Sequence, residues 1–124
     1  MAFTFSLDRT KGDGDGSLLV AKWAGGAAGD AGGAWAFPEW ADASVQVSGT
    51  ISGSTVTIDG SNDGTNWATL FSAQAAALSF TSLTPTPLKQ IVERPLYIRP
   101  NITGGTGSAI EVTIVARRAN PLRT

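Results

Sequence analysis

Alternation of apolar and polar residues with a period of two dominates the chain after residue 43. The apolar members of this pattern are Val45, Val47, Val56, Ile58, Ile110, Val112, Ile114 and Ala116, and Val115 is the one exception in the last run. Successive side chains of a β-strand point to opposite faces of the sheet, so this alternation is typical of strands buried on one face. It predicts that most of the chain forms β-sheet.

Short strands separated by turns follow along the whole chain. We expect strands around Phe3 and Phe5, and at 17–22, 67–71, 78–81, 88–92, 96–99 and 109–118. Ser52–Ser54 is short and contains glycine, as a hairpin connection between the two valine-rich strands would be. Four prolines, including Pro100, lie between strands or at their ends, where a missing N–H disturbs the sheet least. Only residues 73–77 favour a turn of helix.

The pattern predicts an all-β fold: a single-domain antiparallel β-sandwich of jelly-roll-like form. With 124 residues the chain has the length of one domain. We expect an extended N-terminal arm over residues 1–16 and the β-sandwich domain over 17–124, with a Gly/Ala-rich loop at 24–34. Glycine-rich sequence orders at low cost only against another surface, which makes the loop a candidate for contact with a neighbouring subunit.

Composition excludes most catalytic chemistry. The chain has no cysteine and no histidine, so thiolate nucleophiles, cysteine-bound zinc and the usual neutral-pH acid/base are absent. We therefore expect no enzyme and no cofactor. Charged residues make up 15% of the chain, against about 25% in typical domains, which is compatible with a surface partly covered by neighbours. Residues 1–64 carry a net charge of −5 and residues 65–124 one of +4, which suits contacts between copies or with a partner.

Aromatic and basic residues are the candidates for partner contact. Trp23, Trp35, Phe37 and Trp40 surround the Gly/Ala-rich loop. They form either a binding platform for a sugar or a protein, because tryptophan is enriched at interaction hot spots, or a plug at one end of the sandwich. The remaining candidate contact residues are Phe3 and Phe5 in the arm and Arg117 and Arg118 near the C-terminal end.

Two Asp/Gly-rich segments, 11–16 and 59–64, offer oxygen ligands of the kind that calcium prefers. Asp59, Ser61 and Asp63 have calcium-loop spacing, but Leu70 stands where a bidentate acid is required. We therefore interpret both segments as turn or arm sequence and expect no metal. Gly104–Gly107 lacks the lysine and the following helix of a phosphate-binding loop, so a connection between strands is the better interpretation.

Three segments together resemble small β-sandwich structural proteins of tailed bacteriophages, with capsid decoration (cement) proteins as the nearest type. They are residues 56–70, which contain the turn SNDGTNW, residues 94–107 and the strand at 110–118. The resemblance covers about residues 43–118. It implies a non-enzymatic protein present in many copies on a capsid, often as trimers, whose partner is the major capsid protein.

From this resemblance we expect a virion protein on the capsid surface, assembled in the host cytoplasm. No secretory signal or membrane span is seen in the sequence, and the basic C-terminal end has no interleaved aromatics. We therefore expect neither a membrane nor a nucleic acid as partner. Two alternatives stay open: another tail, connector or fibre component, and a carbohydrate-binding module.

Overall fold

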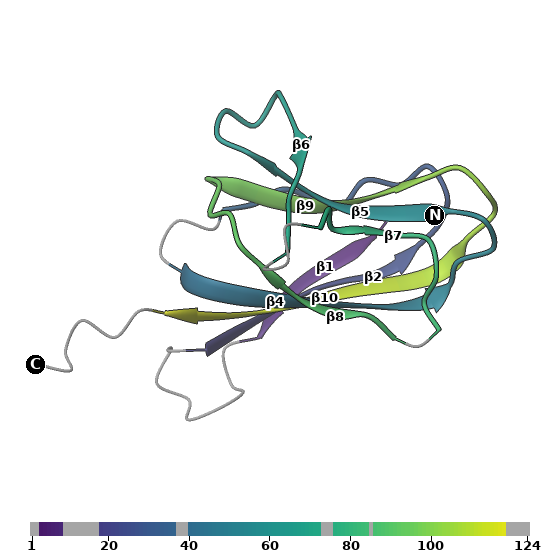
Figure 1. Ribbon diagram of the computed structural model, residues 1–124, viewed down its shortest axis with the longest axis horizontal. Helices are drawn as coiled ribbons and strands as arrows, with labels where there is room; N and C mark the ends of the chain where they lie inside the picture. Colours follow the sequence, from purple (N-terminus) through teal and green to yellow (C-terminus); the bar gives the residue numbers. More distant parts are fainter. Residues whose placement is uncertain (1–2, 9–17, 37–39, 73–75, 85, 119–124) are drawn as a thin grey trace, which may run out of the picture.

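The computed structural model describes residues 3–8, 18–36, 40–72, 76–84 and 86–118, with only the backbone of Trp40, Ala41 and Arg118. Two antiparallel sheets fill these ranges, which hold strands and no helix (Figure 1). Sheet A has the order β1 (Thr4–Asp8), β2 (Leu18–Gly26), β10 (Ser108–Arg118), β4 (Trp40–Thr50) and β8 (Leu88–Ile91). Sheet B has the order β3 (Trp35–Ala36), β9 (Tyr97–Thr103), β5 (Thr55–Ser61) and β6 (Ala68–Thr69), with β7 (Ser79–Phe80) paired to β5. The predicted all-β antiparallel sandwich is confirmed.

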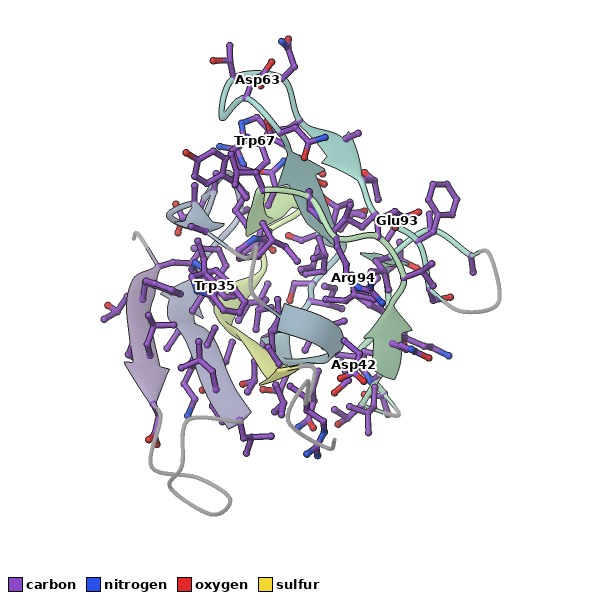
Figure 2. The ribbon with its side chains drawn as sticks, turned by 90° about the vertical axis from the view of Figure 1, so that its left-hand side faces the viewer. Trp35, Asp42, Asp63, Trp67, Glu93 and Arg94 are labelled. Carbon is purple, nitrogen blue, oxygen red and sulfur yellow. The ribbon has the colours of Figure 1, made fainter. Side chains whose placement is uncertain are left out.

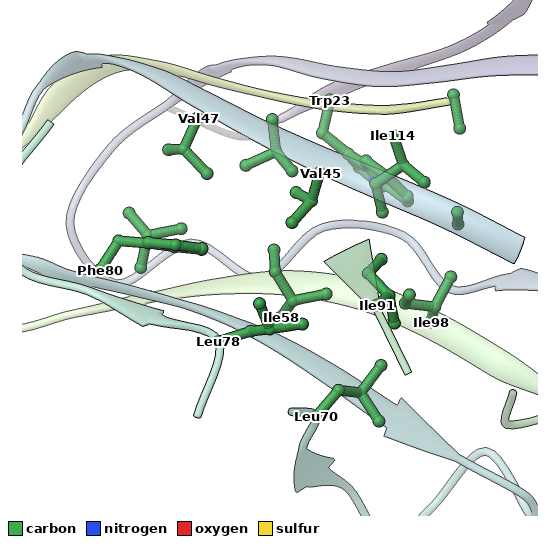
Figure 3. Close-up of a cluster of buried hydrophobic side chains, with 14 of the residues drawn as sticks. Trp23, Val45, Val47, Ile58, Leu70, Leu78, Phe80, Ile91, Ile98 and Ile114 are labelled. Carbon is green, nitrogen blue, oxygen red and sulfur yellow. The ribbon is translucent and has the colours of Figure 1, made fainter. Parts of the chain in front are cut away.

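The core lies between the two sheets (Figure 3). Sheet A contributes the alternating residues of its central strands, including Trp23, Val45 and Ile114, and sheet B contributes residues such as Ile58 and Ile98; all five are fully buried. Burial of a large apolar side chain stabilises the fold by about 1.5–3 kcal/mol. The period-two pattern therefore identified the inward faces correctly. Val115, the exception to that pattern, pairs with Val20, and both are only half-buried.

The connection between β4 and β5 differs from the predicted hairpin. Ile51–Ser54 forms a turn, with the Ser54 N–H donating to the Ile51 carbonyl at 2.8 Å. However, β4 belongs to sheet A and β5 to sheet B, so this turn carries the chain from one sheet to the other. Alternation indicates which face of a strand is buried and carries no information about which sheet the strand joins, and for that reason the hairpin prediction was wrong.

Pro100 lies inside β9 and not at a strand end as predicted. The Pro100 carbonyl accepts a bond from Gly32 N at 2.8 Å, and Ile102, two residues on, exchanges backbone bonds with Gly29 and Asp30. The backbone groups of these alternate residues therefore face the irregular segment 27–34 and not β5. A proline is tolerated here because its missing N–H does not interrupt the ladder between β5 and β9.

Two segments that we expected to reach neighbouring subunits pack on their own domain. Thr4–Asp8, part of the predicted arm, pairs with β2 as an edge strand of sheet A. The predicted loop 24–34 begins inside β2 and then makes backbone hydrogen bonds with β9. The surface that orders the glycine-rich sequence is therefore sheet B of the same chain. The remaining arm residues, 1–2 and 9–16, lie outside the described residues.

Candidate functional site

The connection between β5 and β6 is a self-contained turn organised by Asp63. Its Oδ1 accepts hydrogen bonds from the backbone N–H groups of Thr65 and Asn66, both at 2.8 Å, and from the Ser61 hydroxyl at 2.9 Å. These bonds, led by those of Asn66 and Thr65, hold the pKa of Asp63 well below its usual range, because each of them favours the ionised carboxylate. Gly64 N donates to the Ser61 hydroxyl at 2.8 Å. The turn holds its shape by its own contacts and sets the position of Trp67.

Trp67 and Arg99 meet on the outer face of sheet B, with Tyr97 on the same face of β9 two residues before Arg99, and we call these three residues the Trp67 corner. Tyr97 and Arg99 alternate with buried residues along β9, where they stand opposite Ser61 and Asp59 of β5. The Arg99 guanidinium carbon lies 4.0 Å from the centre of the Trp67 ring. All three side chains of the corner are half-exposed. A flat guanidinium stacked on tryptophan is a cation–π contact that fixes the orientation of both groups.

The cation of the corner has no anionic partner. Among the described residues, the Arg99 side chain makes no hydrogen bond or ion pair, and its Nε atom is buried without an acceptor. An unsatisfied buried donor costs about 1–3 kcal/mol. Asp59, directly opposite, is 7% exposed and accepts a bond from the Thr69 hydroxyl at 3.3 Å. The guanidinium is thus held in place by the ring, with charge available to a partner.

A hollow of about 380 Å³ lies on the inner side of the same β5–β6 hairpin. Figure 2 looks onto this end of the molecule and shows Glu93 and Arg94 below the turn that carries Asp63. Glu93 accepts a bond from Phe71 N at 2.7 Å, and Asn62 accepts one from Leu96 N at 2.9 Å. The polar and charged residues that line the hollow are Ser61, Asn62, Asn66, Glu93 and Arg94.

At this end of the molecule the carboxylates have hydrogen-bond partners within the chain, whereas the guanidinium groups have none among the described residues. Asp59, Asp63 and Glu93 each accept hydrogen bonds from groups of the chain itself. The guanidinium groups of Arg94 and Arg99 have no ion-pair or hydrogen-bond partner in the described part of the chain. The arrangement is suited to receiving an anionic group.

The predicted contact residues of the first third have a different role. Trp23 is fully buried and Trp35 is 6% exposed, with ring centres 6.3 Å apart. Trp23 also donates from Nε1 to the Gly33 carbonyl at 2.9 Å. The prediction that these two tryptophans contact a partner was wrong, because both side chains are buried in the core of the domain. The alternative was that they plug one end of the sandwich, and both side chains do belong to its buried core.

Phe3 and Phe5 are half-buried and pack against the core of their own domain. The Phe5 ring lies 4.7 Å from Trp23. Gly26 leaves space for Phe3, since a Cβ atom there would lie 2.3 Å from the Phe3 ring. Because both side chains remain partly exposed, their contact with a partner stays a prediction.

The other predicted contact residues are placed only in part. Arg117 is exposed beside Asp42, its cross-strand neighbour, at a shallow hollow of about 270 Å³ on the outer face of sheet A. Its role as a contact residue stays a prediction. Phe37 lies outside the described residues, as do the side chains of Trp40 and Arg118.

The described residues contain no group of three or more acidic side chains that could hold a metal ion. The oxygens of Asp63 are engaged within its turn, and Leu70, which fails the calcium pattern, is a core residue. Gly104–Gly107 joins β9 to β10, as predicted, and Gly107 N donates to Ser54 Oγ. No helix able to cross a membrane is found in the described ranges.

No family model matches this chain, and no curated protein matches its sequence. The site is therefore characterised by its geometry alone. Sequence reasoning did not single out Tyr97 and Arg99, and it placed Trp67 only at the end of the SNDGTNW turn and the start of a predicted strand. The alternation Tyr97-x-Arg99 was visible in the sequence, but the register that brings it beside Trp67 was not.

Proposed function

We propose that this chain is a non-enzymatic virion structural protein that binds and stabilises the outer surface of a phage capsid. Its partner in this proposal is the major capsid protein, and its location is the capsid surface, after assembly in the host cytoplasm. The chain would act in many copies, with a trimer as the favoured oligomer. The resemblance of residues 43–118 to phage particle proteins suggests the kind of assembly.

The outer face of sheet B is the observation that carries this proposal. Its described side chains are almost all uncharged and hydrogen-bonding: Thr55, Thr57, Thr69, Ser79, Asn101 and Thr103. The charged members are Asp59, which is buried, and Arg99, which is stacked on Trp67. A face of low charge, with Trp, Tyr and Arg gathered at one corner, has the composition of a protein–protein interface.

Binding of such a face to an assembled shell would stabilise the shell by mass action. A protein that binds the assembled form and not the dispersed subunits adds its binding free energy to the stability of the assembly. Contacts made by several copies at once strengthen the attachment further. The Trp67 corner supplies the residues of largest expected effect in that contact.

Quantitative mass spectrometry of purified particles tests the proposal. The ratio of this chain to the major shell protein is expected to lie within a few-fold of one. A few copies per particle would assign the chain to a tail, connector or fibre, and absence from particles would overturn the virion role altogether. In a reconstituted particle, Trp67→Ala is expected to lower occupancy, whereas Lys89→Gln on the opposite sheet is not.

A carbohydrate-binding module is the second candidate, and half-exposed Trp67 favours it. The hollow on the inner side of its hairpin carries Asn62 and Asn66, which are suitable hydrogen-bonding groups for a sugar. Arg99 covers one face of the Trp67 ring, so a sugar would have to stack on the other face. A saturable change in tryptophan fluorescence with neutral oligosaccharides, lost in Trp67→Ala, would favour this candidate over the capsid role.

A further inference from the structure

We propose that the Trp67 corner is a receptor for a carboxylate-bearing segment of a partner protein. Arg99 would bind an Asp or Glu side chain of the partner, while Trp67 and Tyr97 would provide the apolar contact around it. This inference rests on the proposed role as a structural binding protein and adds the chemistry of the surface that it recognises. It concerns residues that sequence reasoning had not assigned to partner contact.

Arg99 has the geometry that a carboxylate requires. The Arg99 guanidinium carbon lies 4.0 Å from the centre of the Trp67 ring, and this contact limits how far the guanidinium can move. Its N–H groups have no hydrogen-bond or ion-pair partner among the described residues. A planar guanidinium with free N–H groups binds a carboxylate through two parallel hydrogen bonds. Because the ring has already fixed the side chain, little further ordering is needed when the carboxylate binds.

The acidic residues nearby do not compete for Arg99. Asp63 is held by the N–H groups of its own turn, and Glu93 by Phe71 N. Asp59 stands directly across the strand pair, yet its carboxylate accepts a hydrogen bond from the Thr69 hydroxyl and makes no ion pair with the guanidinium. The corner therefore keeps its positive charge in the free protein.

A protein fits this site better than a nucleic acid does. Nucleic-acid binding requires several cations along a chain of phosphates. On the outer face of sheet B, the described residues offer one guanidinium and no row of cations that could follow a chain of phosphates. Apart from Asp59 and Tyr97, the other outward side chains of β5 and β9 are Thr, Ser and Asn, which match the uncharged polar rim of a protein interface. One carboxylate set in a neutral surface is the complementary partner.

Nuclear magnetic resonance titration of the purified full chain tests this proposal. The probe is a blocked peptide of alternating Glu and Ala, and the control probe is the same peptide with Gln in place of Glu. We expect a saturable shift of the Trp67 indole N–H signal with the Glu peptide, and at least about fivefold weaker binding of the Gln peptide. The signal is assigned by its loss in Trp67→Phe.

Three variants show whether binding depends on the charge of Arg99, on the shape of its guanidinium, or on any positive charge of the protein. Arg99→Gln is expected to weaken binding of the Glu peptide about tenfold, and Arg99→Lys to weaken it by an intermediate factor because a point charge replaces the fork. Lys89→Gln removes one positive charge from β8 of the other sheet and is expected to leave the affinity within about twofold. Denaturation midpoints of all variants show whether a loss of binding reflects loss of the fold.

Several results would overturn the proposal. They are the absence of a saturable shift with the Glu peptide, equal binding of the Gln peptide, and unchanged affinity in a folded Arg99→Gln variant. Tighter binding of a thymidine oligonucleotide or of an oligoglucuronate would assign the site to another class of ligand. The particle measurement is independent: an abundant virion protein that does not bind the Glu peptide refutes only this inference, and peptide binding by a chain absent from particles refutes only the virion role.

Discussion

The two ends of sheet B use their polar groups in opposite ways. At the end that carries the turn before β5, Ser54 is 1% exposed, and its hydroxyl donates to Gly104 O at 2.6 Å and accepts from Gly107 N at 2.8 Å. Thr106 N bonds to Ser52 O, which joins the turns 51–54 and 104–107. At the other end, Arg94 and Arg99 have no such partners within the described ranges.

Along β5 and β9, one end therefore contributes to the stability of the fold and the other end offers groups that can bind a partner. The end near Ser54 is closed, because its buried groups satisfy one another and leave nothing for a ligand. We call the Trp67 end open, because its carboxylates accept hydrogen bonds from the chain while its two guanidinium groups have no partner among the described residues. Substitutions at the closed end should therefore change the free energy of unfolding, whereas substitutions at the open end should change binding.

The largest effect on stability is expected for Gly105→Ala. Gly105 has a φ of 59°, and a Cβ atom there would lie 2.3 Å from the backbone of Gly53 and Ser54. We expect a loss of at least about 2 kcal/mol, because the residue is conformationally strained and the two turns must also separate. Urea denaturation measures this loss.

Gly104→Ala is the matched control. Gly104 has a similar φ of 69°, but the nearest atom to its Cβ position is 4.0 Å away. It should cost only about 1 kcal/mol, from conformation alone. Equal losses in the two variants would show that the close approach of the turns contributes nothing to the closed end.

Ser54→Ala is expected to have the next largest effect. It leaves the Gly107 N–H and the Gly104 carbonyl without their buried partner, which costs about 1–3 kcal/mol. Ser79→Ala, at an exposed serine of β7, should change the free energy of unfolding by less than about 0.5 kcal/mol. If calorimetry finds the same small change for both serines, the closed end is not held by this hydroxyl.

Arg99→Gln should change stability little and binding strongly. Removal of the cation–π contact costs about 0.5–1 kcal/mol at a partly exposed site, and removal of the unsatisfied Nε–H offsets part of that cost. We expect a net change of less than about 1 kcal/mol in urea denaturation. A larger loss would mean that Arg99 holds the fold, and the distinction between the two ends would fail.

The smallest effect is expected from acid titration of the Asp63 turn. Because the folded-state pKa of Asp63 lies below its unfolded value, its contribution to stability is fully present above about pH 4 and declines as the pH falls further. The difference in melting temperature between wild type and Asp63→Asn should therefore narrow below about pH 4. A carboxyl-carbon titration midpoint for Asp63 at the ordinary value would contradict the hydrogen-bond pattern of the turn.

Much of the fold could be predicted from local sequence because the physics of a half-buried strand is local. The inward residues of β4, β5 and β10 follow from alternation, and the predicted strands at 78–81 and 88–92 contain β7 and β8. The alternation of apolar and polar residues does not indicate which strands pair with one another. The sheet change between β4 and β5 and the central position of Pro100 in β9 depend on which strands become neighbours.

The candidate site was predicted less well for the same reason. Trp23 and Trp67 are the same residue type, and each lies in or beside a predicted strand. Trp23 is covered by Phe5 of β1 and by the Gly33 segment, whereas Trp67 lies at an open corner under Arg99. The residue type predicted that each tryptophan makes contacts. The segments that pack against it, which are distant in sequence, decided whether it is buried in the core or left partly exposed for a partner.

The sequence by itself determined the all-β class, the inward faces of the main strands, the turn SNDGTNW and the low surface charge, because each depends on residues close together in the chain. Only the tertiary structure decided that the Gly/Ala segment is ordered by β9, that two tryptophans fill the core, and that Arg99 stacks on Trp67. Those contacts join residues far apart in sequence. Their free energies depend on register and sheet order, which local alternation does not encode.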